Sequence, residues 1–247
     1  MSFYDDFAES FSNKRRNPWN AFVNFMKSLE KEEKFQNNSQ TGIWCDLGAG
    51  NGRHLPIVKN YTRKYVGTDI SFQLLLIARN RNDPKKLHNW VACDVNALPF
   101  RKKTFQSIVS VAVFHHILKK HQLRQVLKTI TQLLKTNGIL VLTLWGCFKG
   151  KNESSLKRKN FHRRISNLNI FDSISTSNRY FLGVNDVLIP WTDTTKGKIP
   201  KKTPRIYHLY TFNELIIYSE MFDLVKKETQ HMGLNPGINY FLCLAKK

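Results

Sequence analysis

Short apolar segments alternate with helix-like segments through the first part of the chain. Apolar runs of strand length occupy 43–47, 65–68, 90–93, 105–114 and 139–145. Residues with helical apolar spacing lie between most of these runs. Two more strand-like runs, 222–227 and 239–245, end the chain. Strands that alternate with helices predict an α/β fold with a parallel, doubly wound, Rossmann-like sheet.

Helix boundaries are indicated by a few local signals. Asn17 and Pro18 predict the start of a helix whose apolar face continues to position 29. Residues 30–41 are predicted to form a polar linker, and the helix before the fifth strand is predicted over 122–134. Thr211 and Glu214 have the spacing of a capping box, which predicts a helix start there.

The regular alternation stops at Gly146. Residues 147–204 are basic and rich in turn-forming residues, and a connection of this length is usually functional. We therefore predict one domain over 1–247 with a substrate-binding insertion at 147–204. Within the insertion, 186–191 reads DVLIPW, an apolar run between two basic segments. It is predicted to dock the insertion onto the domain.

The charge balance points to a polyanionic partner. Lys and Arg number 39 against 18 Asp and Glu, a formal net charge of +21. This excess argues against an enzyme of neutral metabolites and favours nucleic acid. No apolar run approaches the roughly 18–20 residues that span a bilayer, so no membrane association is expected. The N-terminal residues are acidic and lack an apolar segment, so no secretory signal is expected.

The cysteines indicate buried thiols and no metal site. Cys45, Cys93, Cys147 and Cys243 include no C-x-x-C pair, so no zinc site is predicted. Three of them lie in or beside apolar runs. Buried free thiols are typical of a reducing compartment, which predicts a cytoplasmic protein.

The turn after the first strand has the chemistry of a cofactor site. Its glycines, Gly48, Gly50 and Gly52, let the backbone approach a ligand closely. Asp69 ends the second strand, where a carboxylate holds ribose hydroxyls, and Asp94 follows the third, where an adenine amino group is read. Ligands of open α/β sheets bind at the carboxyl ends of strands. With Asp46, which precedes the glycines, three acids lie at such ends, and together they favour a site over solvated surface charges.

The spacing DxGxGxG, at 46–52, differs from the dinucleotide fingerprint G-x-G-x-x-G. Together with VGTDIS, ACDVNALPF, FQSIVSVAVFHHI and LLKTNGILVLTLW, it resembles the class I S-adenosylmethionine-dependent methyltransferases. The resemblance implies a seven-stranded sheet whose last strand is antiparallel. It also implies S-adenosylmethionine as cofactor. The cofactor residues it implies are Asp46, Gly48, Gly50 and Gly52 at the methionine part, Asp69 at the ribose, and Asp94 and Val95 at the adenine.

A narrower resemblance covers the segments outside the common fold. FSNKRRNPW, FHH, DVLIPW and RIYHLY are similar to segments of the tRNA methyltransferases that esterify 5-carboxymethyluridine at the wobble position. That family implies tRNA as substrate and a heterodimer with a small zinc-binding activator subunit. It also implies an exposed apolar surface for this partner near 108–112 and 139–143.

The resemblance also implies the residues that receive the acceptor. Arg15 and Arg205 are predicted to bind its carboxylate, since guanidinium groups pair bidentately with carboxylates. His116 and His208 are candidate site residues, with helix-end or packing roles as the alternative. Asp186 is predicted either to pair with an arginine or to contact the uracil. Trp191 and Trp19 are candidate stacking platforms for a flipped base, although such residues are more often buried packing residues.

Two alternatives stay open at this point. One is a class I methyltransferase that acts on another RNA position or on a small carboxylic acid. The other is a non-catalytic RNA-binding protein with a vestigial cofactor pocket. The presence of Asp46, Asp69, Asp94 and the glycines argues against the second.

Overall fold

A computed structural model describes residues 4–39, 42–82, 87–147, 185–192, 202–231 and 237–247. Its centre is a seven-stranded sheet with the order β3-β2-β1-β4-β5-β9-β8. The strands are β1 (Ile43–Leu47), β2 (Lys64–Asp69), β3 (Asn89–Ala92), β4 (Phe105–Val111), β5 (Leu134–Cys147), β8 (Phe222–His231) and β9 (Gly237–Lys246). All seven strands were predicted, with the fifth beginning five residues earlier than expected.

The last strand of the chain is the antiparallel one. β1 pairs in parallel with β2 and β4, and β4 pairs in parallel with β5. β9 lies between β5 and β8 and pairs with both in the antiparallel sense. The predicted topology is therefore confirmed, and the carboxyl ends of the parallel strands lie at one edge of the sheet.

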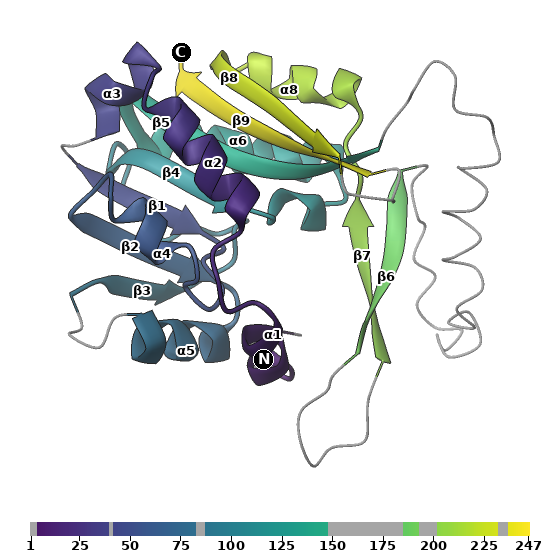
Figure 1. Cartoon of the computed structure of the whole chain (residues 1–247). Helices are drawn as coiled ribbons and strands as arrows, with labels where there is room; N and C mark the ends of the chain where they lie inside the picture. The colour runs from purple at the N-terminus through teal and green to yellow at the C-terminus, as the bar shows by residue number, and fades with distance from the viewer. Residues whose placement is uncertain (1–3, 40–41, 83–86, 148–184, 193–201, 232–236) are drawn as a thin grey trace.

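Helices cover both faces of the sheet (Figure 1). α2 (Asn20–Leu29) and α4 (Leu55–Val58) contribute Phe22, Phe25 and Leu55 to one apolar core. α6 (Lys120–Leu133) and α8 (Ile216–Ser219) contribute to the other core, on the opposite face. The remaining helices are α1 (Ala8–Lys14), α3 (Glu33–Ser39) and α5 (Phe72–Asn82), with 3-10 turns η1 (Phe114–His116) and η2 (Phe212–Leu215).

Three local predictions differ from the structure. The polar linker expected at 30–41 contains α3, because Phe35 is buried and contacts Trp44 with 6.0 Å between ring centroids. The strand expected at 105–114 ends at Val111, where Ala112 adopts φ +60° and turns the chain. α2 begins at Asn20, two residues later than the predicted start at Pro18, and the residue before it, Trp19, packs on Phe241.

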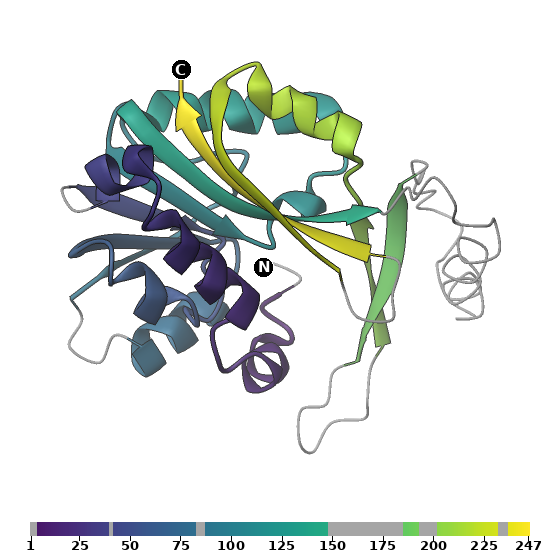
Figure 2. The same cartoon turned by 45° about the horizontal axis from the view of Figure 1, so that its top comes forward.

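The apolar run of the insertion forms a hairpin. β6 (Asp186–Thr192) pairs antiparallel with β7 (Lys202–His208) in a separate two-stranded sheet. Figures 1 and 2 show this hairpin extending away from the seven-stranded sheet. Tyr210 fixes its base, since its N–H donates to Trp145 O at 2.8 Å and its hydroxyl donates to Phe114 O at 3.0 Å.

The predicted apolar partner surface on the fourth and fifth strands is wrong. β4 and β5 are central strands, each paired on both sides. Ile108, Val109, Ile139 and Val141 are at most 1% exposed, because helices cover both faces of the sheet. A partner protein cannot reach these side chains in the folded domain.

Among the residues that the structure describes, no helix combines the length and apolar character needed to cross a bilayer.

Candidate functional site

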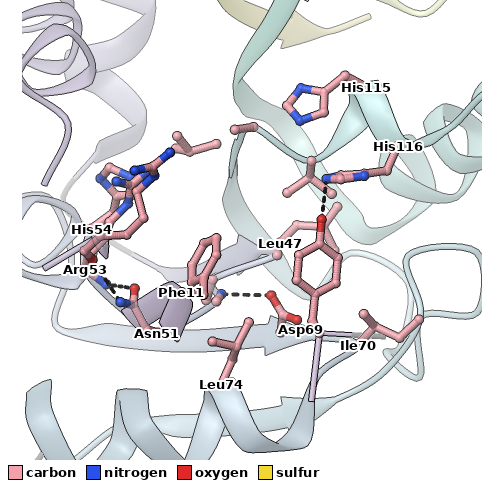
Figure 3. A pocket seen from close by; sticks show the side chains of 18 of the residues that line it. Phe11, Leu47, Asn51, Arg53, His54, Asp69, Ile70, Leu74, His115 and His116 are labelled. Atoms are coloured by element: carbon pink, nitrogen blue, oxygen red, sulfur yellow. Dashed lines mark hydrogen bonds between the residues drawn. The ribbon is translucent and has the colours of Figure 1, made fainter. Parts of the chain in front are cut away.

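A cavity of about 1290 Å³ opens at the carboxyl ends of the parallel strands. The N-terminal segment, the glycine loop, the end of β2, η1 and β7 all contribute to its lining. Figure 3 shows the glycine-loop side with Asn51, Arg53 and His54, and the opposite side with His115 and His116. Asp69 lies between these two sides. The cavity therefore joins most of the predicted cofactor residues to part of the predicted acceptor residues.

The glycine loop turns its backbone toward the cavity. Gly48 and Gly50 adopt φ +79° and +56°, a region that side-chain-bearing residues rarely occupy. The N–H of Gly50 donates to Asp69 Oδ2 at 2.8 Å. A Cβ added at Gly50 would lie in ordinary contact, 3.8 Å from Phe11 and 4.0 Å from Asp69, whereas one added at Gly48 would clash with the side chain of Val113. The loop therefore presents its backbone to the cavity, which fits a ligand that lies against the backbone.

Gly52 has a packing role instead of the predicted ligand contact. It does not line the cavity. A Cβ placed there would lie 2.9 Å from Ala78 and 3.1 Å from Trp90. The third glycine thus allows α5 and β3 to approach the loop closely.

Asp46 also lies outside the cavity. Its side chain is buried beneath the loop, and its Oδ2 accepts a hydrogen bond of 2.9 Å from the Tyr65 hydroxyl. Burial raises the pKa of Asp46 to about 7. The structure thus places the Asp46 carboxylate at the support of the loop and not against a bound methionine group.

Asp69 and Asp94 lie where the cofactor prediction places them, on the cavity lining. Asp69 also accepts the Ser71 N–H at 2.9 Å, and burial raises its pKa to about 6. Asp94 accepts from the Asn96 N–H at 2.8 Å, and Val95 lines the cavity beside it. An acid at the end of β2 and a polar residue after β3 suit a ribose and an adenine in adjacent positions.

Arg15 and Arg205 both line the cavity, although they are separated by most of the chain. Asn51 Nδ2 donates to the carbonyl of Arg15 at 2.9 Å, which ties the N-terminal segment to the glycine loop. The Arg205 guanidinium lies over the Tyr207 ring, 5.1 Å from its centroid. The two predicted carboxylate-binding arginines are therefore brought into one site.

His116 is neutral at physiological pH. Burial and the nearby Arg205 lower its pKa to about 4. Its Nε2 lies 3.1 Å from the Tyr4 hydroxyl, the contact marked at His116 in Figure 3. His116 thus offers hydrogen bonding and no charge, and positive charge at this end comes from arginine. His115 stacks on Trp145 at 4.2 Å between ring centroids and is a packing residue.

Asp186 and His208 do not line the cavity, in contrast to the prediction. His208 Nδ1 lies 2.7 Å from Asp186 Oδ1, and its Nε2 lies 3.1 Å from Glu214 Oε1. Their side chains hold each other at the base of the hairpin. Trp191 pairs with Thr203 through the backbone, and its side chain lies outside the described residues. Trp19 lines the cavity and packs on Phe241.

The cavity residues that were not predicted from the sequence include Tyr4, Arg53, His54 and Tyr207. Arg53 directly follows the DxGxGxG spacing, and Tyr207 lies between Arg205 and His208, so both had a signal within motifs already noted. Burial and the nearby Arg15 lower the pKa of Arg53 to about 10. Tyr4 had no signal in the sequence.

Comparison with known proteins agrees with this geometry. A family described as "Methyltransferase domain" matches residues 45–142. The chain is 26% identical over 242 residues to the tRNA (carboxymethyluridine(34)-5-O)-methyltransferase alkbh8 of Xenopus tropicalis, covering 86% of this chain and 35% of that protein. It is 25% identical over 224 residues to the tRNA (carboxymethyluridine(34)-5-O)-methyltransferase of Schizosaccharomyces pombe, and the match covers 91% of this chain and 81% of that protein. A solved S-adenosylmethionine-dependent methyltransferase from Methanosarcina mazei superposes with a TM-score of 0.63 at 14% identity, over 87% and 97% of the two chains.

The sheet order matches the class I S-adenosylmethionine-dependent methyltransferase fold, and the glycine loop and the acids at the strand ends lie within the residues that the methyltransferase-domain family matches. S-adenosylmethionine is the cofactor of this class. Within the class, the chain is similar to the tRNA (carboxymethyluridine(34)-5-O)-methyltransferases. It spans 35%, 22% and 21% of the length of three vertebrate relatives of that name.

Proposed function

We propose that this protein transfers a methyl group from S-adenosylmethionine to the carboxylate of 5-carboxymethyluridine at the wobble position of tRNA, forming 5-methoxycarbonylmethyluridine. One observation carries the proposal. Arg15 and Arg205 line the same cavity, whereas the acids of its described lining are Asp69 and Asp94, at the cofactor end. This distribution of charge suits an anionic acceptor. The names of the similar proteins support the same acceptor.

The chemistry needs positioning more than proton transfer. S-adenosylmethionine supplies an electrophilic methyl group on a sulfonium. An acceptor carboxylate is ionised near pH 7, so its oxygen attacks without a general base. Burial lowers the pKa of His116 to about 4, which makes it a weak base and is consistent with a reaction that removes no proton. Arg15 and Arg205 line the cavity and orient the carboxylate for in-line attack.

Binding of tRNA is supported by the charge of the whole chain. The net charge of +21 provides an electrostatic surface for phosphates. Two basic runs, KGKNESSLKRKNFHRR and KGKIPKKTPR, flank β6, and most of their residues lie outside the described structure. In this proposal, 1–247 is one domain, 147–204 is its substrate-binding insertion, and Trp191 stacks on the target base. Affinity for tRNA should fall steeply with added salt.

The partner and the location are part of the same proposal. A small zinc-binding activator subunit would form a heterodimer with the chain in the cytoplasm. Because β4 and β5 are enclosed, this subunit has to contact another part of the domain. The terminal strands of the described sheet are β3 and β8. Exposed apolar side chains include Phe72 at the start of α5, Leu87 two residues before β3, and Leu224 on β8.

The proposal is tested with the activator subunit present. The protein is incubated with methyl-labelled S-adenosylmethionine and tRNA that carries 5-carboxymethyluridine. We expect label in the tRNA that mild alkali releases, because an ester hydrolyses there. Label that survives alkali would indicate another RNA position. Turnover of small carboxylic acids without tRNA would indicate a metabolite enzyme.

If no methyl group is transferred to any acceptor, a binding measurement shows whether the protein is an enzyme at all. Titration calorimetry measures whether S-adenosylmethionine binds to the protein. No cofactor binding together with retained tRNA binding would favour a non-catalytic RNA-binding protein.

A further inference from the structure

Tyr4 lies where the cofactor end and the acceptor end of the cavity meet. Its hydroxyl is 3.1 Å from His116 Nε2, and its ring stands edge-on to that of His116, with 5.8 Å between centroids. Arg205 and Tyr207 also lie close enough to the phenol to affect its pKa. The Tyr4 side chain thus lies against the acceptor end of the cavity, with its hydroxyl in contact with His116.

The N-terminal segment that carries Tyr4 is attached at several points. Asp5 Oδ1 accepts from the Ser71 hydroxyl at 2.7 Å and from the Gln73 N–H at 3.1 Å. Further along, Arg81 Nη1 donates to the Ser12 carbonyl at 3.3 Å. These contacts join the segment to α5, immediately after the cofactor residue Asp69. The position of Tyr4 is therefore set by the structure around the cofactor end.

We propose that Tyr4 is a positioning residue for the acceptor carboxylate. Its hydroxyl holds Arg205 and His116 in the arrangement that receives the carboxylate. This assignment rests on the proposed function and adds to it a residue from outside the family motifs.

Fixing Arg205 in advance helps acceptor binding because a free arginine side chain is flexible. An arginine side chain has many rotamers, and fixing one of them costs conformational entropy. Contacts that fix the guanidinium before the acceptor arrives remove that cost from acceptor binding. Tyr207 supplies a ring face for Arg205. Tyr4 supplies a hydroxyl, which stays protonated near neutral pH because burial raises its pKa.

Tyr4→Phe is the direct test, because it keeps the ring and removes only the hydroxyl. Steady-state kinetics with the full chain, the activator subunit and modified tRNA should show KM for tRNA raised about tenfold, as expected for one lost hydrogen bond to a charged group. The kcat at saturating tRNA and the Kd for S-adenosylmethionine should stay near wild type. Tyr61→Phe is the matched control, since the Tyr61 hydroxyl donates to Glu30 outside the cavity. It should change none of the three values.

Two results would overturn the assignment. Either KM for tRNA is unchanged in Tyr4→Phe, or the Kd for S-adenosylmethionine rises as much as KM does, which would make the segment a cover for the cofactor. If Tyr4→Phe does not fold, Asp5→Ala takes its place and should raise KM for tRNA in the same way. A wild-type protein that binds S-adenosylmethionine but never methylates the tRNA would instead overturn the proposed function, and this assignment with it.

Discussion

His208 Nδ1 lies 2.7 Å from Asp186 Oδ1, and the two residues are directly opposite each other in the β6–β7 hairpin. The other ring nitrogen of His208 lies 3.1 Å from Glu214 Oε1. Glu214 forms the capping box with Thr211 that starts η2. His208 therefore connects the two strands of the hairpin to each other and to the turn that follows. The hairpin carries Arg205 and Tyr207 into the cavity, so this connection sets where they lie.

His208→Ala should loosen the hairpin without touching the cofactor end. Two hydrogen bonds to carboxylates are lost, each worth about 1.5–3 kcal/mol when buried and less here, because the site is partly exposed. We expect faster amide hydrogen exchange at 205–208 and a raised KM for tRNA, with an unchanged Kd for S-adenosylmethionine. His121→Ala in α6 serves as the control, since His121 is exposed. Unchanged exchange at 205–208 would show that His208 does not hold the hairpin.

Arg205→Lys should weaken acceptor binding while it keeps the positive charge. An ammonium cannot form the two parallel hydrogen bonds that a guanidinium forms with a carboxylate. We expect kcat/KM for tRNA to fall about tenfold or more, because roughly one charged hydrogen bond is lost. The exposed Arg101 lies outside the cavity, and Arg101→Lys is the matched control. Equal kinetics for the two variants would remove Arg205 from the acceptor site.

Asp69→Ala should weaken the binding of S-adenosylmethionine. The variant removes the carboxylate that holds the Gly50 N–H and faces the expected ribose. Loss of one or two hydrogen bonds to a charged group predicts a Kd for S-adenosylmethionine raised about 10- to 100-fold, measured by titration calorimetry. Asp223→Ala, at an exposed position of β8, controls for the loss of one negative charge. A Kd for Asp69→Ala that matches the control would mean that the ribose lies elsewhere.

Asp46→Asn should give a stability difference that depends on pH. The ordinary pKa of 3.8 is raised to about 7 in the folded protein, so between these values the native carboxyl is protonated while the unfolded one is ionised. This group therefore costs the wild type stability as pH rises from about 4 to 7, and no more above 7. Asparagine keeps an acceptor for the Tyr65 hydroxyl and has no proton to lose.

The free energy of unfolding of Asp46→Asn relative to wild type should thus increase with pH over that interval, by at most about 1.4 kcal/mol per pH unit. Urea titrations of the cofactor-free proteins at several pH values measure it. Asp223→Asn is the exposed control and should show a flat difference. A flat difference for Asp46→Asn as well would mean that its carboxyl is not buried as described.

The main sheet was predictable because its strands are apolar runs between helical segments. The cofactor end was predictable because parallel strands bring Asp69 and Asp94 to one edge. The hairpin was harder to predict, because Pro190 argues against a strand. In the structure Pro190 pairs with Pro204 in a two-stranded ribbon. Each strand there has an outer edge, where a residue without an N–H is tolerated.

Side-chain roles within motifs were less predictable than the motifs themselves. Asp46 and Gly52 belong to the DxGxGxG spacing, yet they support and pack the loop from outside the cavity. His208 was noted beside Arg205, but alternation along β7 and the pairing with Asp186 direct it to the hairpin base. Tyr4 reaches the site only through the path of the N-terminal segment. Long-range contacts decide these positions, and one sequence does not contain them.

The central claim is that a tRNA carboxylate receives the methyl group. Mass spectrometry of nucleosides from tRNA, before and after treatment with the protein, the proposed activator subunit and S-adenosylmethionine, tests it most directly. We predict that 5-carboxymethyluridine decreases and that 5-methoxycarbonylmethyluridine appears in equal amount. An unchanged amount of 5-carboxymethyluridine, with a methyl group on any other nucleoside, would contradict the claim.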